Sequence, residues 1–225
     1  MSKISITIWT FFLILLLTLT LVYLWQIGGI LLFPKHITIT RQLSLYQWAA
    51  LGFVLYVVFH RLVDKNISFL EVMSHEWTHI IVAMLFLRRI HSFHAEERSG
   101  VVYTSGNRIS DVPMTLAPYC LPIVTYLLLA LRCLISSQGL MVFDILIGIS
   151  ISFHFFCFRS QTSSRQPDIR SYPIAFSYLY IWTARLMNLA IILVAFFPSY
   201  NVFTSIGRYF TTAFDNISTF VSMIS

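Results

Sequence analysis

The chain has 225 residues, of which 57% are hydrophobic and only 11% are charged, with a mean hydropathy of +0.77. This composition excludes an ordinary soluble domain and predicts a membrane protein. The formal net charge is +6, but the basic residues stand in short segments beside apolar runs, so lipid headgroups explain them better than nucleic acid. The three cysteines lie within apolar runs without metal-site spacing, and an odd number cannot pair completely.

Six apolar segments are long enough to cross a bilayer as helices. A crossing takes roughly 20 apolar residues, because every backbone polar group must be hydrogen-bonded within the segment. The first segment is too long for a signal peptide and no small-residue cleavage site follows it, so we expect it to remain as an anchor. The six segments are approximately 6–25, 45–63, 67–87, 114–135, 141–158 and 174–197.

The basic residues are distributed unevenly over the segments that connect these spans. Nine lie in the first, third and fifth connections, against four in the termini and the other two connections. Cytoplasmic loops carry an excess of Lys and Arg, so the odd-numbered connections are predicted to face the cytoplasm. We therefore predict an all-α polytopic protein, integral to the lipid bilayer of the cell (inner) membrane and without a nucleic-acid partner.

No internal repeat or linker divides the chain, so a single membrane-embedded domain is predicted over 1–225, with its core at about 67–197. The most polar interruption follows the third span, at 91–113. Within it the residues VVYT are β-prone and lie between two turn signals, which predicts a short strand or hairpin.

The C-terminal segment, 198–225, is predicted to be an amphipathic helix. It lies in the membrane interface or, alternatively, packs against the protein. Its apolar residues recur three or four positions apart: Phe203, Ile206, Phe210, Phe214, Ile217, Val221 and Ile224.

The third span carries the motif H-E-x-x-H within the sequence SHEWTHIIVAM. On a helix His75 and His79 lie one turn apart on the same face, so their imidazoles can bind one Zn²⁺. Glu76 points beside the metal, where it can accept a proton from water and pass one to a leaving amine. Because each ionisable group in an apolar span costs roughly 2 to 3 kcal/mol, a functional reason for the motif is favoured.

A zinc hydrolase usually has three protein ligands and one open position, so a third ligand is needed. The candidates are Asp168, Asp144 and His154. If the third span crosses the bilayer, His79 lies roughly 18 Å deep, and Asp168 has to dip inward from the end of the fifth span to reach it. Asp144 faces a similar gap from the other side.

The motif helix, the β-prone segment and then LAPYCLPI at the start of the next span resemble the site-2 protease family of intramembrane zinc metalloproteases. The closer resemblance is to its compact bacterial branch without a PDZ domain, and it covers roughly 69–188. In that branch an aspartate after a polar turn precedes the last core helix, and RQPDIRSYPIAFSYLYIW fits this description. The resemblance therefore implies Asp168 as third ligand. The L-D-G motif of the better-known branch is absent, and the nearest match, around Asp144, lacks the glycine.

The resemblance implies one catalytic Zn²⁺ and hydrolysis of peptide bonds in or near transmembrane segments of membrane-protein substrates, with Glu76 as general base. The stretch 101–104 could receive an unwound substrate segment by β-augmentation, or could be a plain surface hairpin. One alternative is an inactive zinc-binding protein that binds or retains other membrane proteins, although such a site does not need Glu76. A second alternative is a haem-binding or transport protein that uses His60, His75, His79 and His154.

Overall fold

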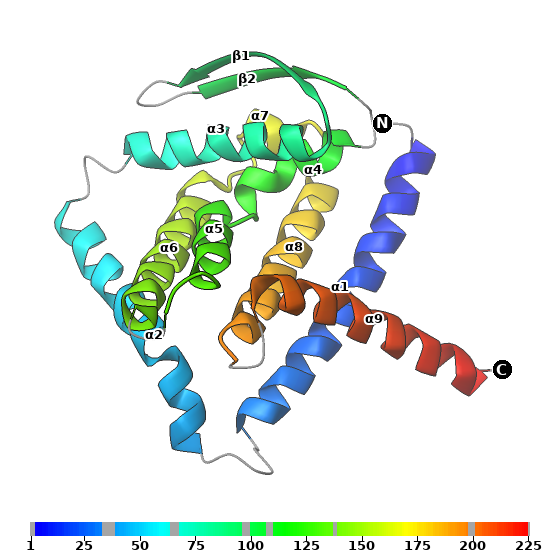
Figure 1. Ribbon diagram of the computed structural model, residues 1–225. Coiled ribbons are helices and arrows are strands. Elements are labelled where there is room, and N and C mark those ends of the chain that lie inside the picture. The colour runs from blue at the N-terminus through cyan, green and yellow to red at the C-terminus, as the bar shows by residue number, and fades with distance from the viewer. Residues whose placement is uncertain are drawn as a thin grey trace.

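A computed structural model describes residues 3–32, 39–63, 68–95, 100–106, 110–136, 139–197 and 201–224. Over these residues the chain is mostly helical, with a two-stranded sheet inserted after the helix that carries H-E-x-x-H (Figure 1). The predicted combination of apolar helices and a small β-hairpin is therefore confirmed.

Three described helices are long and apolar enough to cross a membrane, and a fourth crossing is added if a bent pair counts as one span. The three are α1 (Lys3–Leu32), α6 (Leu140–Gln161) and α8 (Ile174–Ala195). The bent pair joins α4 (Asp111–Leu116) and η2 (Ala117–Tyr119) to α5 (Ile123–Arg132) at 85°. Six spans are thus not confirmed among the described residues, because α2 (Ile39–Leu62) and α3 (Ser68–Leu85) are not among these candidates.

The break before α5 exposes backbone carbonyl groups, and side chains from α8 bind them. Pro122 follows the break and has no N–H with which to continue the helix. The Arg185 Nε donates to the Tyr119 carbonyl oxygen at 2.9 Å, and the Asn188 amide donates to that of Cys120, also at 2.9 Å. A broken helix among apolar neighbours is stable only when its freed polar groups are bonded in this way.

Two helix packings build most of the remaining core. The helix α1 packs along α8, and α9 (Val202–Ile224) packs on both of them. There the buried hydroxyl groups of Tyr209 and Thr20 hydrogen-bond at 2.6 Å. On the other side α2 packs along α6, where Gly52 and Gly148 allow the two backbones to approach closely.

A helix is found over most of the predicted C-terminal segment. Its first half packs against the protein through buried residues such as Tyr209, whereas its second half carries exposed apolar side chains, including Phe214 and Val221, and extends away from the other helices (Figure 1). Packing on the protein thus accounts for the first half. For the second half of α9, a position in the membrane interface stays a prediction.

The β-hairpin follows α3 directly and lies against it (Figure 1). Its strands, β1 (Arg89–Ala95) and β2 (Gly100–Ser105), are antiparallel, with an irregularity between Ile90 and Ser92. The β-prone stretch 101–104 lies within β2. Between α3 and β1, Leu87 adopts a φ of 53°, a left-handed conformation that is uncommon for a residue with a side chain.

The helix α3 crosses the carboxyl end of α6 instead of running beside it (Figure 1). Its hydrogen bonds to α6 reach only the last residues of that helix: Ser160 donates to the Glu71 carboxylate and Gln161 to the Glu71 carbonyl oxygen, both at 3.0 Å. The expectation that Asp168 must dip far inward assumed that α3 ran parallel to the spans. In the crosswise arrangement, the turn after α6 already lies next to α3.

Candidate metal centre

Each histidine of the motif is held by a hydrogen bond at its Nδ1 atom. The His75 Nδ1 lies 3.0 Å from the Gln161 side-chain oxygen, and the His79 Nδ1 lies 2.8 Å from the Met114 carbonyl oxygen. Both contacts need the proton on Nδ1, which leaves each Nε2 with a lone pair for a metal. The Nε2 atoms are therefore the atoms through which α3 could bind a metal.

The Met114 carbonyl is available to His79 for a reason that is visible in the sequence. In a helix this oxygen would accept from the N–H four residues later, but that residue is Pro118, which has no N–H. The carbonyl therefore has no helical donor, and the imidazole supplies one.

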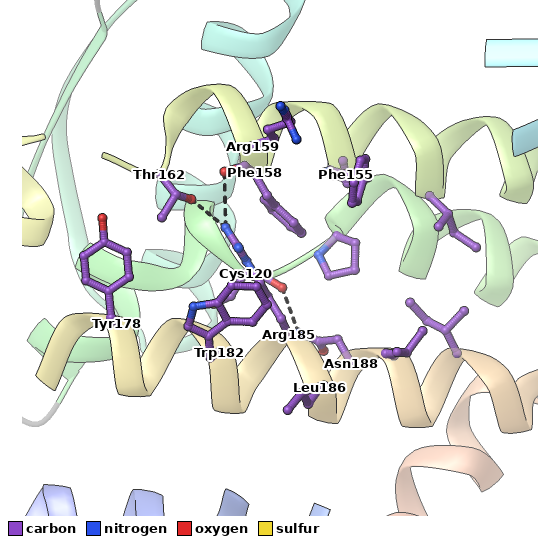
Figure 2. Close-up of a pocket in the computed structure, with 15 residues that line it drawn as sticks. Cys120, Phe155, Phe158, Arg159, Thr162, Tyr178, Trp182, Arg185, Leu186 and Asn188 are labelled. Atoms are coloured by element: carbon purple, nitrogen blue, oxygen red, sulfur yellow. Dashed lines mark hydrogen bonds between the residues drawn. The ribbon is translucent and has the colours of Figure 1, made fainter. Parts of the chain in front are cut away.

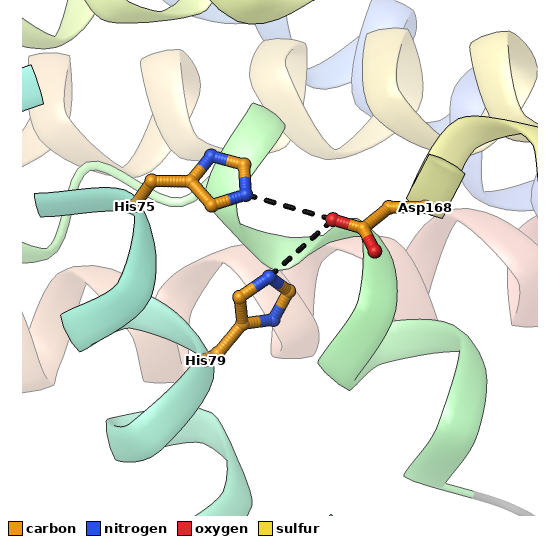
Figure 3. A group of neighbouring side chains, drawn as sticks. All are labelled: His75, His79 and Asp168. Atoms are coloured by element: carbon orange, nitrogen blue, oxygen red, sulfur yellow. Dashed lines mark ion pairs between the residues drawn. The ribbon is translucent and has the colours of Figure 1, made fainter. Parts of the chain in front are cut away.

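Asp168 completes a group of three possible metal ligands (Figure 3). It lies in α7 (Pro167–Arg170), directly after the turn that leaves α6. Its Oδ2 atom is 3.5 Å from the His75 Nε2 and 3.4 Å from the His79 Nε2, and all three ligand atoms lie within 4.8 Å of one another. The Tyr119 hydroxyl donates to the same Oδ2 at 3.1 Å.

These separations suit a zinc ion. Two ligand atoms bound tetrahedrally to Zn²⁺ at about 2.0 to 2.1 Å lie about 3.4 Å apart. The two nitrogen-to-oxygen distances at Asp168 match this separation, the two Nε2 atoms lie within 4.8 Å of each other, and two imidazoles with one carboxylate are a common catalytic zinc ligand set. The residues present therefore fit the metal.

The pKa values of the two carboxyl groups of this region are shifted in opposite directions. Glu76 is 5% exposed, and burial raises its pKa, with Asp168 adding to the rise and the two histidines opposing it. Burial also tends to raise the pKa of Asp168, but the contacts with the His75 and His79 rings outweigh it and hold that pKa well below its usual range when those rings are protonated. Asp168 thus ionises readily, whereas Glu76 holds a proton more readily.

The other candidate ligands lie elsewhere and have different partners. Asp144 pairs with Arg132, whose Nε lies 2.7 Å from its Oδ1. The His154 Nε2 accepts the Val124 N–H at 3.2 Å. The structure therefore brings Asp168, and neither Asp144 nor His154, to the histidine pair.

The four histidines of the haem or transport alternative are not gathered into one site. His60 stacks on Phe156 with ring centroids 4.1 Å apart, and His154 is engaged by the Val124 N–H. Among the residues that the structure describes, His75 and His79 are the only two of these four histidines whose rings contact each other, with centroids 5.0 Å apart.

Sequence reasoning did not single out Tyr119, Gln161 or the Met114 carbonyl group. Tyr119 belongs to the quoted stretch LAPYCLPI, and the proline spacing around Met114 was a usable signal. Gln161 gave no signal, because nothing local to it shows that α3 lies across its helix.

A family model described as Peptidase M50B-like matches residues 45–165 of the chain. The matched region includes the H-E-x-x-H motif and ends just before Asp168. Neither the search of curated proteins nor the search of solved structures found a match.

Proposed function

The chain belongs to the Peptidase M50B-like family, a site-2 protease family domain, and we propose that it is a membrane-embedded zinc metallopeptidase. Its substrates on this proposal are other membrane proteins, cut in or near their transmembrane segments. The observation that carries the proposal is the approach of Asp168 to the two Nε2 atoms of the motif, at distances that suit zinc.

His75, His79 and Asp168 would hold the ion. When bound, Zn²⁺ polarises the scissile carbonyl group and lowers the pKa of water. Glu76, one residue from His75 on the same helix, takes a proton from the attacking water and delivers it to the leaving amine.

The residues around the ligands fix their geometry. Gln161 and the Met114 carbonyl group orient the two imidazoles, and the Tyr119 hydroxyl group orients the Asp168 carboxylate. Contacts of this kind raise ligand basicity and prevent ring rotation, and their loss typically weakens metal binding by about 10- to 100-fold.

The β-hairpin offers a place for the substrate backbone. In the described part of the chain β1 and β2 pair only with each other, so one edge of each strand has no strand partner. The hairpin lies against the zinc-motif helix, and the Thr104 hydroxyl group of β2 contacts the sulfur of Met114 at 3.0 Å. An unwound substrate segment that paired with the unpaired edge of β2 would lie close to the metal ligands.

The substitution Glu76→Gln tests the proposal. We expect purified wild-type protein to contain one zinc per chain and to cleave a reconstituted membrane protein, whereas Glu76→Gln retains the zinc and loses at least about 100-fold in cleavage rate. Metal analysis and a gel assay measure the two properties. A wild-type protein that remains metal-free when zinc is supplied contradicts the proposal, and one that binds zinc without cleaving any membrane substrate favours a binding-only role.

A further inference from the structure

A cavity of about 570 Å³ lies between the carboxyl half of α6 and the facing part of α8 (Figure 2). Its inner surface includes Cys120 and Pro122 at the break before α5. We call it the α6–α8 cavity. Its volume is within the range of sites that bind small molecules, about 300 to 1,000 Å³.

The α6–α8 cavity changes from polar to apolar along the helices. Arg159, Thr162 and Tyr178 line it near the carboxyl end of α6 and the start of α8, while Ile151 and Ile192 line its other end. At 1.5 Å per residue these ends are about 12 Å apart along α6, from Arg159 to Ile151, and about 21 Å apart along α8, from Tyr178 to Ile192. Since α6 and α8 are candidate spans, the polar end lies toward the membrane surface and the apolar end toward the membrane interior.

The rim of the α6–α8 cavity is exposed. Trp182 is 55% exposed, Phe155 52% and Leu189 46%, and all three line the cavity. Large apolar side chains exposed on candidate spans face the lipid, so the cavity opens sideways to the bilayer.

The polar end carries two positive charges without a carboxylate partner among the described residues. Arg185 donates only to neutral groups: the carbonyl oxygens of Tyr119 and Phe158 and the Thr162 hydroxyl group. Its guanidinium lies 5.1 Å from the ring centroids of both Phe158 and Trp182. The ion pairs that the structure describes involve Asp168, Asp111 and Asp144, and neither cavity arginine takes part.

We propose that the α6–α8 cavity binds one anionic phospholipid, with its phosphate group at Arg159 and Arg185 and an acyl chain along Ile151 and Ile192. The two arginines provide the charge that a phosphate needs, and the polar-to-apolar order matches the order of headgroup and chain. A free phosphate ion would leave the apolar end unfilled, and a protein helix would leave both arginines without an anion.

The connection between α6 and α8 is expected on the cytoplasmic side from its own composition, because it carries Arg159, Arg165 and Arg170 next to two candidate spans. The cytoplasmic leaflet is rich in anionic lipid and attracts basic residues close to the membrane. The proposal does not depend on the protease activity, and its failure would leave that activity untouched.

Quenching of Trp182 fluorescence by brominated lipid tests the proposal. The protein is reconstituted in phosphatidylcholine vesicles with an increasing fraction of phosphatidylglycerol, and in turn one or the other lipid carries bromine on its acyl chains. Subtraction of the signal of Trp182→Phe isolates this residue from the other four tryptophans. We expect brominated phosphatidylglycerol to quench Trp182 at about a tenfold lower mole fraction than brominated phosphatidylcholine.

The controls use arginines of the same connection. Arg159→Gln should reduce the preference for phosphatidylglycerol about fivefold, the effect of one basic residue, and Arg159→Lys should restore most of it. Arg165→Gln removes the same charge from an exposed position that does not line the cavity. It should change the preference for phosphatidylglycerol less than twofold, compared with about fivefold for the loss of one charge at the cavity. Arg159 is also exposed and makes none of the hydrogen bonds that hold Arg185, so its variants should fold.

Four results would overturn the proposal. Equal quenching by the two lipids, or an equal effect of Arg165→Gln and Arg159→Gln, would indicate that there is no specific anion site. Loss of the phosphatidylglycerol preference when millimolar inorganic phosphate is added would assign the arginines to a soluble anion. Quenching in pure phosphatidylcholine by a brominated transmembrane peptide that excludes phosphatidylglycerol would assign the cavity to a protein segment.

Discussion

At the scale of single residues, the candidate centre depends on side chains whose partners are distant in the sequence. His75 and His79 are local neighbours on one helix, but their supports come from α6 and from the segment after the hairpin, and Asp168 comes from α7. The Tyr119 hydroxyl group that donates to Asp168 comes from η2, so metal affinity should respond to residues on five different elements: α3, α4, η2, α6 and α7. Two predictions separate ligands from supports.

Asp168→Ala should remove zinc binding, while Asp144→Ala should leave one zinc per chain. The reason is that Asp168 faces both Nε2 atoms, whereas Asp144 is paired with Arg132. Breaking the latter pair should instead lower the free energy of unfolding by about 3 kcal/mol, because a largely buried arginine loses its partner. Metal analysis and thermal unfolding in detergent measure the two effects. Zinc loss in Asp144→Ala alone would assign the third ligand to Asp144.

Gln161→Leu should weaken zinc binding by about 10- to 100-fold without abolishing it, because the His75 ring loses the acceptor that orients it. Ser160→Ala is the matched control, since it removes the neighbouring hydrogen bond to the Glu71 carboxylate and does not touch a histidine. Competition with a chelator of known affinity measures both variants. Equal zinc affinities in the two variants would show that Gln161 does not orient His75.

At the scale of elements, the crosswise position of α3 and the close packing of α2 on α6 determine where the site forms. The helix α6 ends beneath α3, so the direction of α6 decides where the following segment with Asp168 lies. The helix α2 packs along α6. The sequence predicted both the helices and the hairpin from apolar runs and turn signals. It did not predict the angle between α3 and the spans, which depends on contacts between distant segments.

Gly52→Ala and Gly148→Ala should each lower the free energy of unfolding by about 1 to 3 kcal/mol or more. A methyl group on Gly52 would collide with the Ile145 carbonyl group, and one on Gly148 with that of Ala49. Gly28→Ala is the control, because nothing lies within 4 Å of the added atom, and it should be neutral or slightly stabilising. Thermal unfolding in one detergent compares the three. Unchanged stability in both α2–α6 variants would contradict the close backbone approach.

At the scale of the whole molecule, α1 packs along α8 and α9 packs on both, so the two terminal helices are joined through α8. This arrangement ties the helix that carries Arg185 and Asn188 to both terminal helices. The break before α5 is in turn held by those two side chains. Loosening α9 should therefore destabilise the core around the metal centre.

Tyr209→Ala should lower the free energy of unfolding by about 3 kcal/mol or more, because it leaves a cavity between α9 and α1 and removes the hydrogen bond to Thr20. Phe210→Ala removes a ring of similar size from an exposed position on the same helix and should have an effect below about 1 kcal/mol. Unfolding in detergent provides the comparison. Equal effects would show that α9 does not contribute to the core.

The sequence by itself determined the membrane class, the hairpin after the motif and the pairing of His75 with His79, because these follow from composition, turn residues and the pitch of one helix. The family resemblance implied Asp168 as third ligand, but only the tertiary structure brought it, and not Asp144, to the two histidines and placed Gln161, Tyr119 and the Met114 carbonyl group around this group. Periodicity describes how a helix presents its own side chains. It carries no information on the angle at which α3 crosses α6, and that angle decides which distant carboxylate reaches the histidines.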